Sequence, residues 1–100
     1  MPGPKGWTFL TNHTHVLLCI ADDPEVRLRE VAARVGITER ATQKIVHDLV
    51  ADGYVALTKV GRRNHYRLLP GGRFRHPLEE PHEVSDLLAL FQTGRATPQG

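Results

Sequence analysis

The sequence predicts an α+β fold, mostly α-helical, with a three-helix core, a β-hairpin and one further helix. Apolar residues recur at helical spacing in three segments, at about 12–22, 28–35 and 39–52. Two segments with strand composition, 54–58 and 65–68, flank a basic turn that contains Gly61. A last apolar repeat at helical spacing lies within residues 82–93.

Length and composition indicate one soluble domain. The chain has 100 residues, of which 40% are hydrophobic and 24% charged, which is typical of a globular protein with one core. Cys19 is the only cysteine, so an internal disulfide is excluded. The longest apolar run is far too short to cross a bilayer, and residues 1–6 lack the apolar stretch of a signal peptide. We therefore expect a cytoplasmic protein that has no membrane partner.

The charges are distributed unevenly. Residues 59–76 contain six Lys or Arg and no Asp or Glu, whereas acidic residues gather at 22–25 and 79–86. Such a separated basic stretch is typical of a surface that binds a polyanion. An arginine-rich solvated loop is the alternative interpretation.

The first predicted helix is expected to be the central buried one. It is apolar around much of its circumference from Val16 to Ala21, and Thr11 precedes it as an N-cap residue. Pro24 ends it, because proline disfavours helical geometry in the residue before it. Val26 and Arg27 are expected to form a very short strand.

The next two helices meet at a glycine. Gly36 stands where the second helix needs a left-handed residue, Ile37 is an apolar plug, and Thr38 caps the third helix. The inward side of the third helix should consist of Thr42, Ile45, Val46 and Leu49. Its opposite face carries Arg40, Gln43, Lys44 and His47.

Residues 7–70 combine small and apolar residues at fixed spacing with a basic hairpin. The spaced residues are Ala32 and Gly36 in and after the second helix and Val46 in the third, each with apolar neighbours. The segment resembles the winged helix-turn-helix of bacterial and archaeal transcription regulators of the multiple-antibiotic-resistance-regulator (MarR) and arsenic-repressor (ArsR) kind. The resemblance implies a homodimer that binds double-stranded DNA, with helix 39–52 in the major groove and a wing at 59–65 on the backbone or minor groove. The DNA-binding residues that it implies are Thr38, Arg40, Ala41, Gln43, Lys44, His47, Lys59, Arg62, Arg63, Asn64 and His65.

Residue chemistry assigns roles within that set. Arginine can bond guanine and glutamine can bond adenine in bidentate fashion, so Arg40 and Gln43 are the candidates for base readout. Ala41 is expected near a thymine methyl and Thr38 near a phosphate. Plain surface charge remains the alternative for Arg40 and Lys44, and coverage of an apolar edge is the alternative for His65.

The rest of the chain is expected to support the domain. Residues 1–6 and 94–100 should be mobile tails, and the proline-rich segment 71–81 should be an irregular connection. Helix 82–93 is predicted to dimerise, and the alternative is that it folds back onto the first helix. The expected dimerisation residues are Val84, Leu87, Leu88 and Phe91.

Other functions remain open to different degrees. No catalytic motif is present, so we expect neither an enzyme nor a cofactor. A metal-sensing repressor would need converging ligands, and six histidines with a single cysteine depart from that pattern, so no metal site is expected.

A protein-interaction module and a non-specific DNA binder remain alternatives. A small-molecule effector is unknown, and its expected position is the crevice between the last helix and the core.

Overall fold

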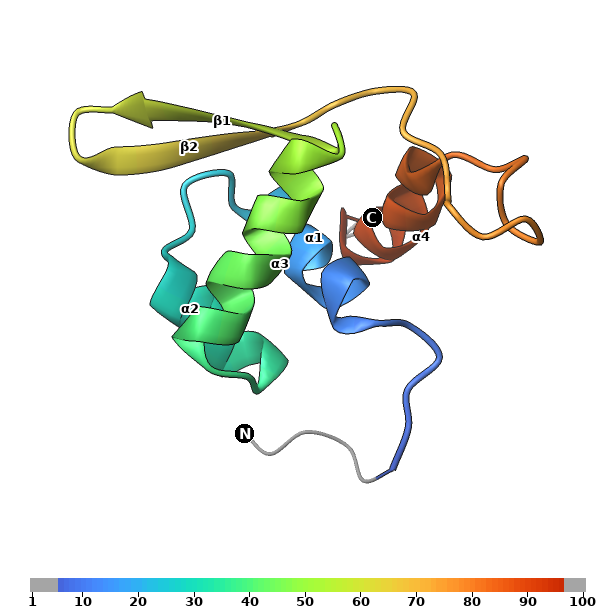
Figure 1. The fold of residues 1–100 in the computed structure, drawn as a ribbon, viewed down its shortest axis with the longest axis horizontal. Coiled ribbons are helices and arrows are strands. Elements are labelled where there is room, and N and C mark those ends of the chain that lie inside the picture. Colours follow the sequence, from blue (N-terminus) through green and yellow to red (C-terminus); the bar gives the residue numbers. More distant parts are fainter. Residues whose placement is uncertain (1–5, 97–100) are drawn as a thin grey trace.

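A computed structural model describes residues 6–96, with side chains described through Phe91. Of the tails expected at 1–6 and 94–100, residues 1–5 and 97–100 lie outside the described residues. The elements are α1 (Asn12–Asp22), α2 (Leu28–Val35), α3 (Glu39–Ala51), β1 (Val55–Val60), β2 (Arg63–Leu68) and α4 (Val84–Ala96). The strands form a two-stranded antiparallel sheet that projects from the helical core, and α2 and α4 lie on opposite sides of that core (Figure 1).

The first helix is the centre of the fold, as predicted. Val16 and Ile20 are almost completely buried, and α1 contacts α2, α3, α4 and β2. Val31 of α2, Thr42 of α3 and Val55 of β1 complete the most deeply buried set. Apolar burial against one helix therefore holds the other elements in place.

The predicted capping residues Thr38 and Gly36 cap their helices as expected, whereas the side chain of Thr11 does not cap α1. Thr38 accepts a hydrogen bond at Oγ1 from the backbone N–H of Ala41, at 3.0 Å, as an N-cap residue should. Thr11 occupies the corresponding position before α1, but its side chain makes no cap hydrogen bond, so that expectation was wrong for the side chain. Gly36 has φ +89° and donates its N–H to the carbonyl of Ala32, which confirms the left-handed end of α2.

Val26 and Arg27 do not form the short strand that was expected. The backbone N–H of Tyr66 instead donates to the carbonyl of Pro24 at 2.8 Å, so one hydrogen bond ties this segment to β2. Proline has no N–H to offer to a strand ladder, which limits pairing here. Val26 is nevertheless buried in the core.

The hairpin turn is shorter than predicted. Val60 pairs with Arg63, so the turn consists of Gly61 and Arg62 only. Lys59 and Asn64, which were expected at the hairpin tip, pair with each other within the strands. Gly61 has φ +63°, and glycine at the first turn position with positive φ is what a two-residue type II′ turn requires.

The last helix begins later and ends later than predicted. The carbonyl of His82 accepts a hydrogen bond from the N–H of Phe74, and Glu83 forms an isolated antiparallel β-bridge with Arg73. The helix α4 therefore begins at Val84 rather than at residue 82. It continues to Ala96, past the expected end at residue 93, because one glycine within a helix costs only about 1 kcal/mol. Residues 94–96, which were expected to belong to the tail, are thus part of α4.

Two of the expected dimerisation residues belong to the chain's own core. Leu88 is only 4% exposed and Val84 packs against the core, where α4 contacts α1. For these two residues the alternative, a helix folded back onto its own domain, is the observed arrangement. Leu87 is half-buried, and Phe91 is exposed.

Replacing Leu88 with alanine should therefore destabilise the folded chain by roughly 2–5 kcal/mol, because it leaves a cavity beside α1. Urea denaturation measures the change. Leu78→Ala is the matched control, since Leu78 is 86% exposed and its loss should cost less than about 0.5 kcal/mol. Equal stability of the two variants would contradict the packing of α4 on α1.

Candidate nucleic-acid interface

The outward face of α3 is polar because its inward side is buried. Thr42, Ile45, Val46 and Leu49 all lie in the core, as predicted. A helix of 3.6 residues per turn then directs Arg40, Gln43 and His47 to solvent, and all three are exposed. With the side chains of residues 6–91 they form no hydrogen bond or ion pair, so their polar groups are available to a ligand.

The start of α3 is arranged as an anion-facing helix end. The hydroxyl oxygen of Thr38 accepts from Ala41, but its proton remains available for a phosphate oxygen. Ala41 is half-buried, one residue beyond Arg40. Glu39 also lies in the first turn, where the helix dipole favours a carboxylate.

Lys44 has an ion-pair partner among the residues that the structure describes, unlike the other polar residues of this face of α3. Its Nζ lies 2.8 Å from Asp48 Oδ1, and His13 Nε2 lies 2.9 Å from Asp48 Oδ2. The hydrogen bond from Lys44, followed by that from His13, lowers the pKa of Asp48 to about 2. A DNA contact by Lys44 would therefore compete with Asp48.

The predicted wing residues fall into two groups. Lys59 and Arg62 are exposed, and within the described chain neither has an ion pair. Arg63 Nη1 and His65 Nδ1 both approach the carboxylate of Glu25, at 3.6 and 3.5 Å. Asn64 is half-buried, and its amide donates to the hydroxyl of Tyr66 at 3.4 Å.

A groove joins the wing to the starts of α2 and α3. Its volume is about 470 Å³, and its lining includes Arg62, Arg63 and Asn64 of the hairpin, together with Glu39. Arg27 and Arg29, at the start of α2, line the same groove. The basic side of the molecule is therefore wider than the wing and α3 alone.

Residues 10–56 match the family of winged helix-turn-helix DNA-binding domains. The helices and the hairpin described above have the winged helix-turn-helix fold. The match covers α1, α2, α3 and the start of β1. It therefore includes α3 with its exposed polar face and the elements against which α3 packs.

Two solved transcriptional regulators resemble the chain. PcaV from Streptomyces coelicolor, solved with its natural ligand, is 22% identical with a TM-score of 0.55, covering 89% of this chain. The zinc-dependent MarR-family regulator AdcR in its Zn(II)-bound state is 19% identical with a TM-score of 0.46, covering all of this chain and 69% of AdcR. The chain spans 64% of the length of PcaV, and the likeness to PcaV supports the fold. No curated protein sequence matches the chain significantly.

Sequence reasoning missed Arg27 and Arg29 as candidate DNA-binding residues of the winged helix-turn-helix domain. They stand two apart around Leu28 and follow the acidic residues 22–25, so they form no basic run. Only their place in the fold could have indicated them as candidates, because the start of the second helix lies beside the wing.

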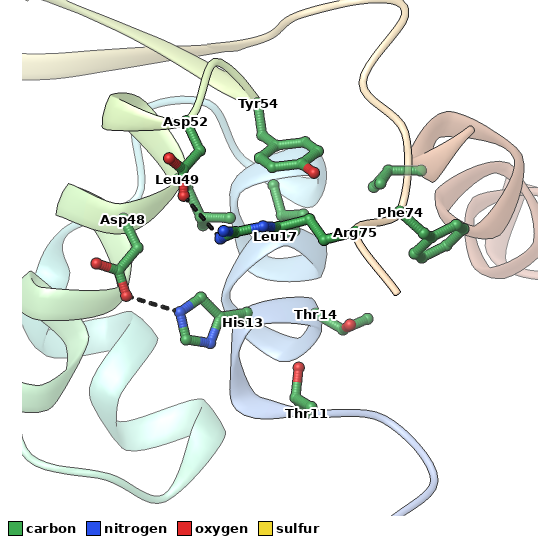
Figure 2. A pocket seen from close by; sticks show the side chains of 11 residues that line it. Thr11, His13, Thr14, Leu17, Asp48, Leu49, Asp52, Tyr54, Phe74 and Arg75 are labelled. Atoms are coloured by element: carbon green, nitrogen blue, oxygen red, sulfur yellow. Dashed lines mark hydrogen bonds and ion pairs between the residues drawn. The ribbon is translucent and has the colours of Figure 1, made fainter. Parts of the chain in front are cut away.

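A second cavity, of about 290 Å³, lies between α1, α3, the connection and the start of α4. Figure 2 shows His13 directed at Asp48, and Arg75 reaching from the connection toward Asp52, with 3.0 Å between Arg75 Nη1 and Asp52 Oδ2. The cavity lies in the crevice where an effector was expected. Binding of an effector there stays a prediction.

Among the described residues, no group of three or more His, Cys, Asp or Glu side chains is placed to hold a metal ion. No helix in the described part of the chain combines the length and the apolar character needed to cross a membrane.

Asp48→Asn should destabilise the domain in a pH-dependent way. The folded-state pKa of Asp48 lies below its ordinary value of 3.8, so the stabilisation is present above about pH 4 and is lost as the pH falls toward 2. Denaturation of both proteins at about pH 5 and about pH 2.5 measures the difference. A deficit in the variant that stays constant between the two pH values would contradict the ion pairs of Asp48.

Proposed function

We propose that this chain is a sequence-specific regulator of transcription that binds double-stranded DNA. It inserts α3 into the major groove and lays the wing, residues 59–65, on the adjacent backbone or minor groove. The observation that carries this proposal is the row of polar side chains on the outward face of α3, beside Lys59 and Arg62 of the wing, all without a side-chain partner in the part of the chain that the structure describes. Binding, rather than catalysis, is the role that these groups can perform.

Base readout falls to the first turns of α3. Arg40 has the free guanidinium that pairs with guanine O6 and N7, and Gln43 has the free amide that pairs with adenine N6 and N7. Ala41 offers a methyl group to thymine. Lys44 and His47 lie further along the helix and contact a base edge or the backbone.

Phosphate contacts surround this face on two sides. Thr38 offers its hydroxyl proton at the start of α3, and Lys59 and Arg62 offer their charges from the wing. Arg63, Asn64 and His65 reach phosphates only when they leave their partners within the chain. These contacts set position and affinity rather than sequence preference.

Two copies of the chain associate through exposed apolar side chains outside the DNA-binding face. Leu90 and Phe91 of α4 are 68% and 42% exposed, and Trp7 and Phe9 stack edge to face with ring centroids 4.8 Å apart while both remain exposed. Exposed apolar side chains that adjoin one another, as these pairs do, are more typical of an interaction surface than single ones such as Leu78. A two-fold dimer would place two recognition helices about one turn of DNA, ~34 Å, apart.

Arg40→Ala should weaken binding to the best duplex from a randomised pool by about 1–3 kcal/mol and relax the preference at one base pair. Arg62→Ala is the matched control, because it removes an equally free arginine from the wing. It should weaken all duplexes alike and reduce the slope of log K against log salt by about 1. Fluorescence anisotropy over a salt series measures both, and uniform weakening by Arg40→Ala would exclude Arg40 from base readout.

Phe91→Asp should convert the dimer to monomers in sedimentation velocity, because it puts a charge into the apolar contact. Leu78→Asp, at an exposed leucine of the connection, should leave the dimer intact. A dimer that survives Phe91→Asp would place the interface elsewhere, and a wild-type protein that sediments as a monomer would refute the dimer.

A further inference from the structure

Glu25 is held at the base of the wing by the backbone around it. Its N–H donates to Asp23 Oδ1 at 3.0 Å, and the N–H of Val26 donates to the carbonyl of Asp23 at the same distance. The carbonyl of Pro24 accepts from Tyr66 in β2. The turn that carries Glu25 is thus fixed against the hairpin.

From this position the carboxylate reaches the two basic side chains of β2. Oε1 lies 3.6 Å from Arg63 Nη1, and Oε2 lies 3.5 Å from His65 Nδ1. Both distances are longer than a good hydrogen bond, and the Glu25 side chain is 52% exposed. These contacts are therefore weak enough for an incoming anion to displace.

Four arginines share a groove with this carboxylate. Arg27, Arg29, Arg62 and Arg63 line the same groove as Glu25, together with the carboxylate of Glu39. In a chain that binds DNA, guanidinium groups in such a groove are suited to meet a phosphodiester. Glu25 places a negative charge of the chain itself at that point.

We propose that Glu25 is an intramolecular competitor of the DNA phosphate, which occupies Arg63 and His65 until DNA displaces it. This inference rests on the proposed DNA binding and adds a residue that opposes it. Glu25 competes only for contacts with the phosphate backbone of DNA and not for contacts with base edges. The competition therefore lowers the affinity for every duplex by the same factor and leaves the base preference unchanged.

Glu25→Gln tests the inference, since it keeps the size of the side chain and removes its charge. The variant should bind both the preferred duplex and an unrelated duplex roughly two- to fivefold more tightly than wild type at low salt, with a steeper salt dependence. Glu80→Gln makes the same change of net charge in the connection between β2 and α4 and should have a smaller effect, because that connection lies on the other side of the molecule from the wing tip (Figure 1).

The mechanism is tested in a second background. In the Arg63→Gln, His65→Gln double variant, adding Glu25→Gln should bring no gain beyond that of Glu80→Gln, because the competitor has lost its partners. A gain that persists there, or unchanged or weaker binding by Glu25→Gln alone, would overturn the proposal. Absence of DNA binding by wild type would refute the proposed function first, and the competitor with it.

Discussion

The inward side of α3 packs against α1, α2 and β1, and this packing fixes the rotation of α3 about its own axis. Thr42 is fully buried, and Ile45, Val46 and Leu49 lie beside it in the core. With that side buried, the helical repeat leaves Arg40, Gln43 and His47 on the opposite face, where none of them has a hydrogen bond or ion pair with the described residues. The apolar core therefore determines which polar groups a DNA duplex would meet.

Two backbone features then place this face beside the wing. Gly36 allows α2 to end and α3 to begin within a few residues, because its left-handed geometry costs glycine little. The hydrogen bond from Tyr66 to Pro24 ties β2 to the segment before α2, so the wing, the start of α2 and the start of α3 border one groove. Acidic groups moderate the basic charge here, with Asp48 beside Lys44 and Glu25 beside Arg63.

Local signals in the sequence were sufficient for the elements but not for their pairing. Apolar spacing, Gly36 and Thr38 predicted α1, α2 and α3 because helix formation and capping depend on residues a few positions apart. The partner of Arg63 and His65 escaped prediction, since Glu25 lies far from both along the chain. The pair of Lys44 with Asp48 is four residues apart on one helix, a spacing that local helix geometry could have predicted, whereas the contact of His13 with Asp48 joins distant residues. The same reason explains α4, whose apolar side was read as a dimer contact although Leu88 packs on the chain's own core.

The most direct test is selection of bound sequences from a random duplex pool, with binding titrated at two salt concentrations. Exposed polar groups on α3 in a two-fold dimer predict an enriched, two-fold symmetric motif with half-sites about 10 base pairs apart. Salt should weaken binding without changing the motif, because phosphate contacts supply affinity and base contacts supply preference. Strongly salt-dependent binding without any motif would contradict readout by α3, and no binding at low salt would contradict DNA binding itself.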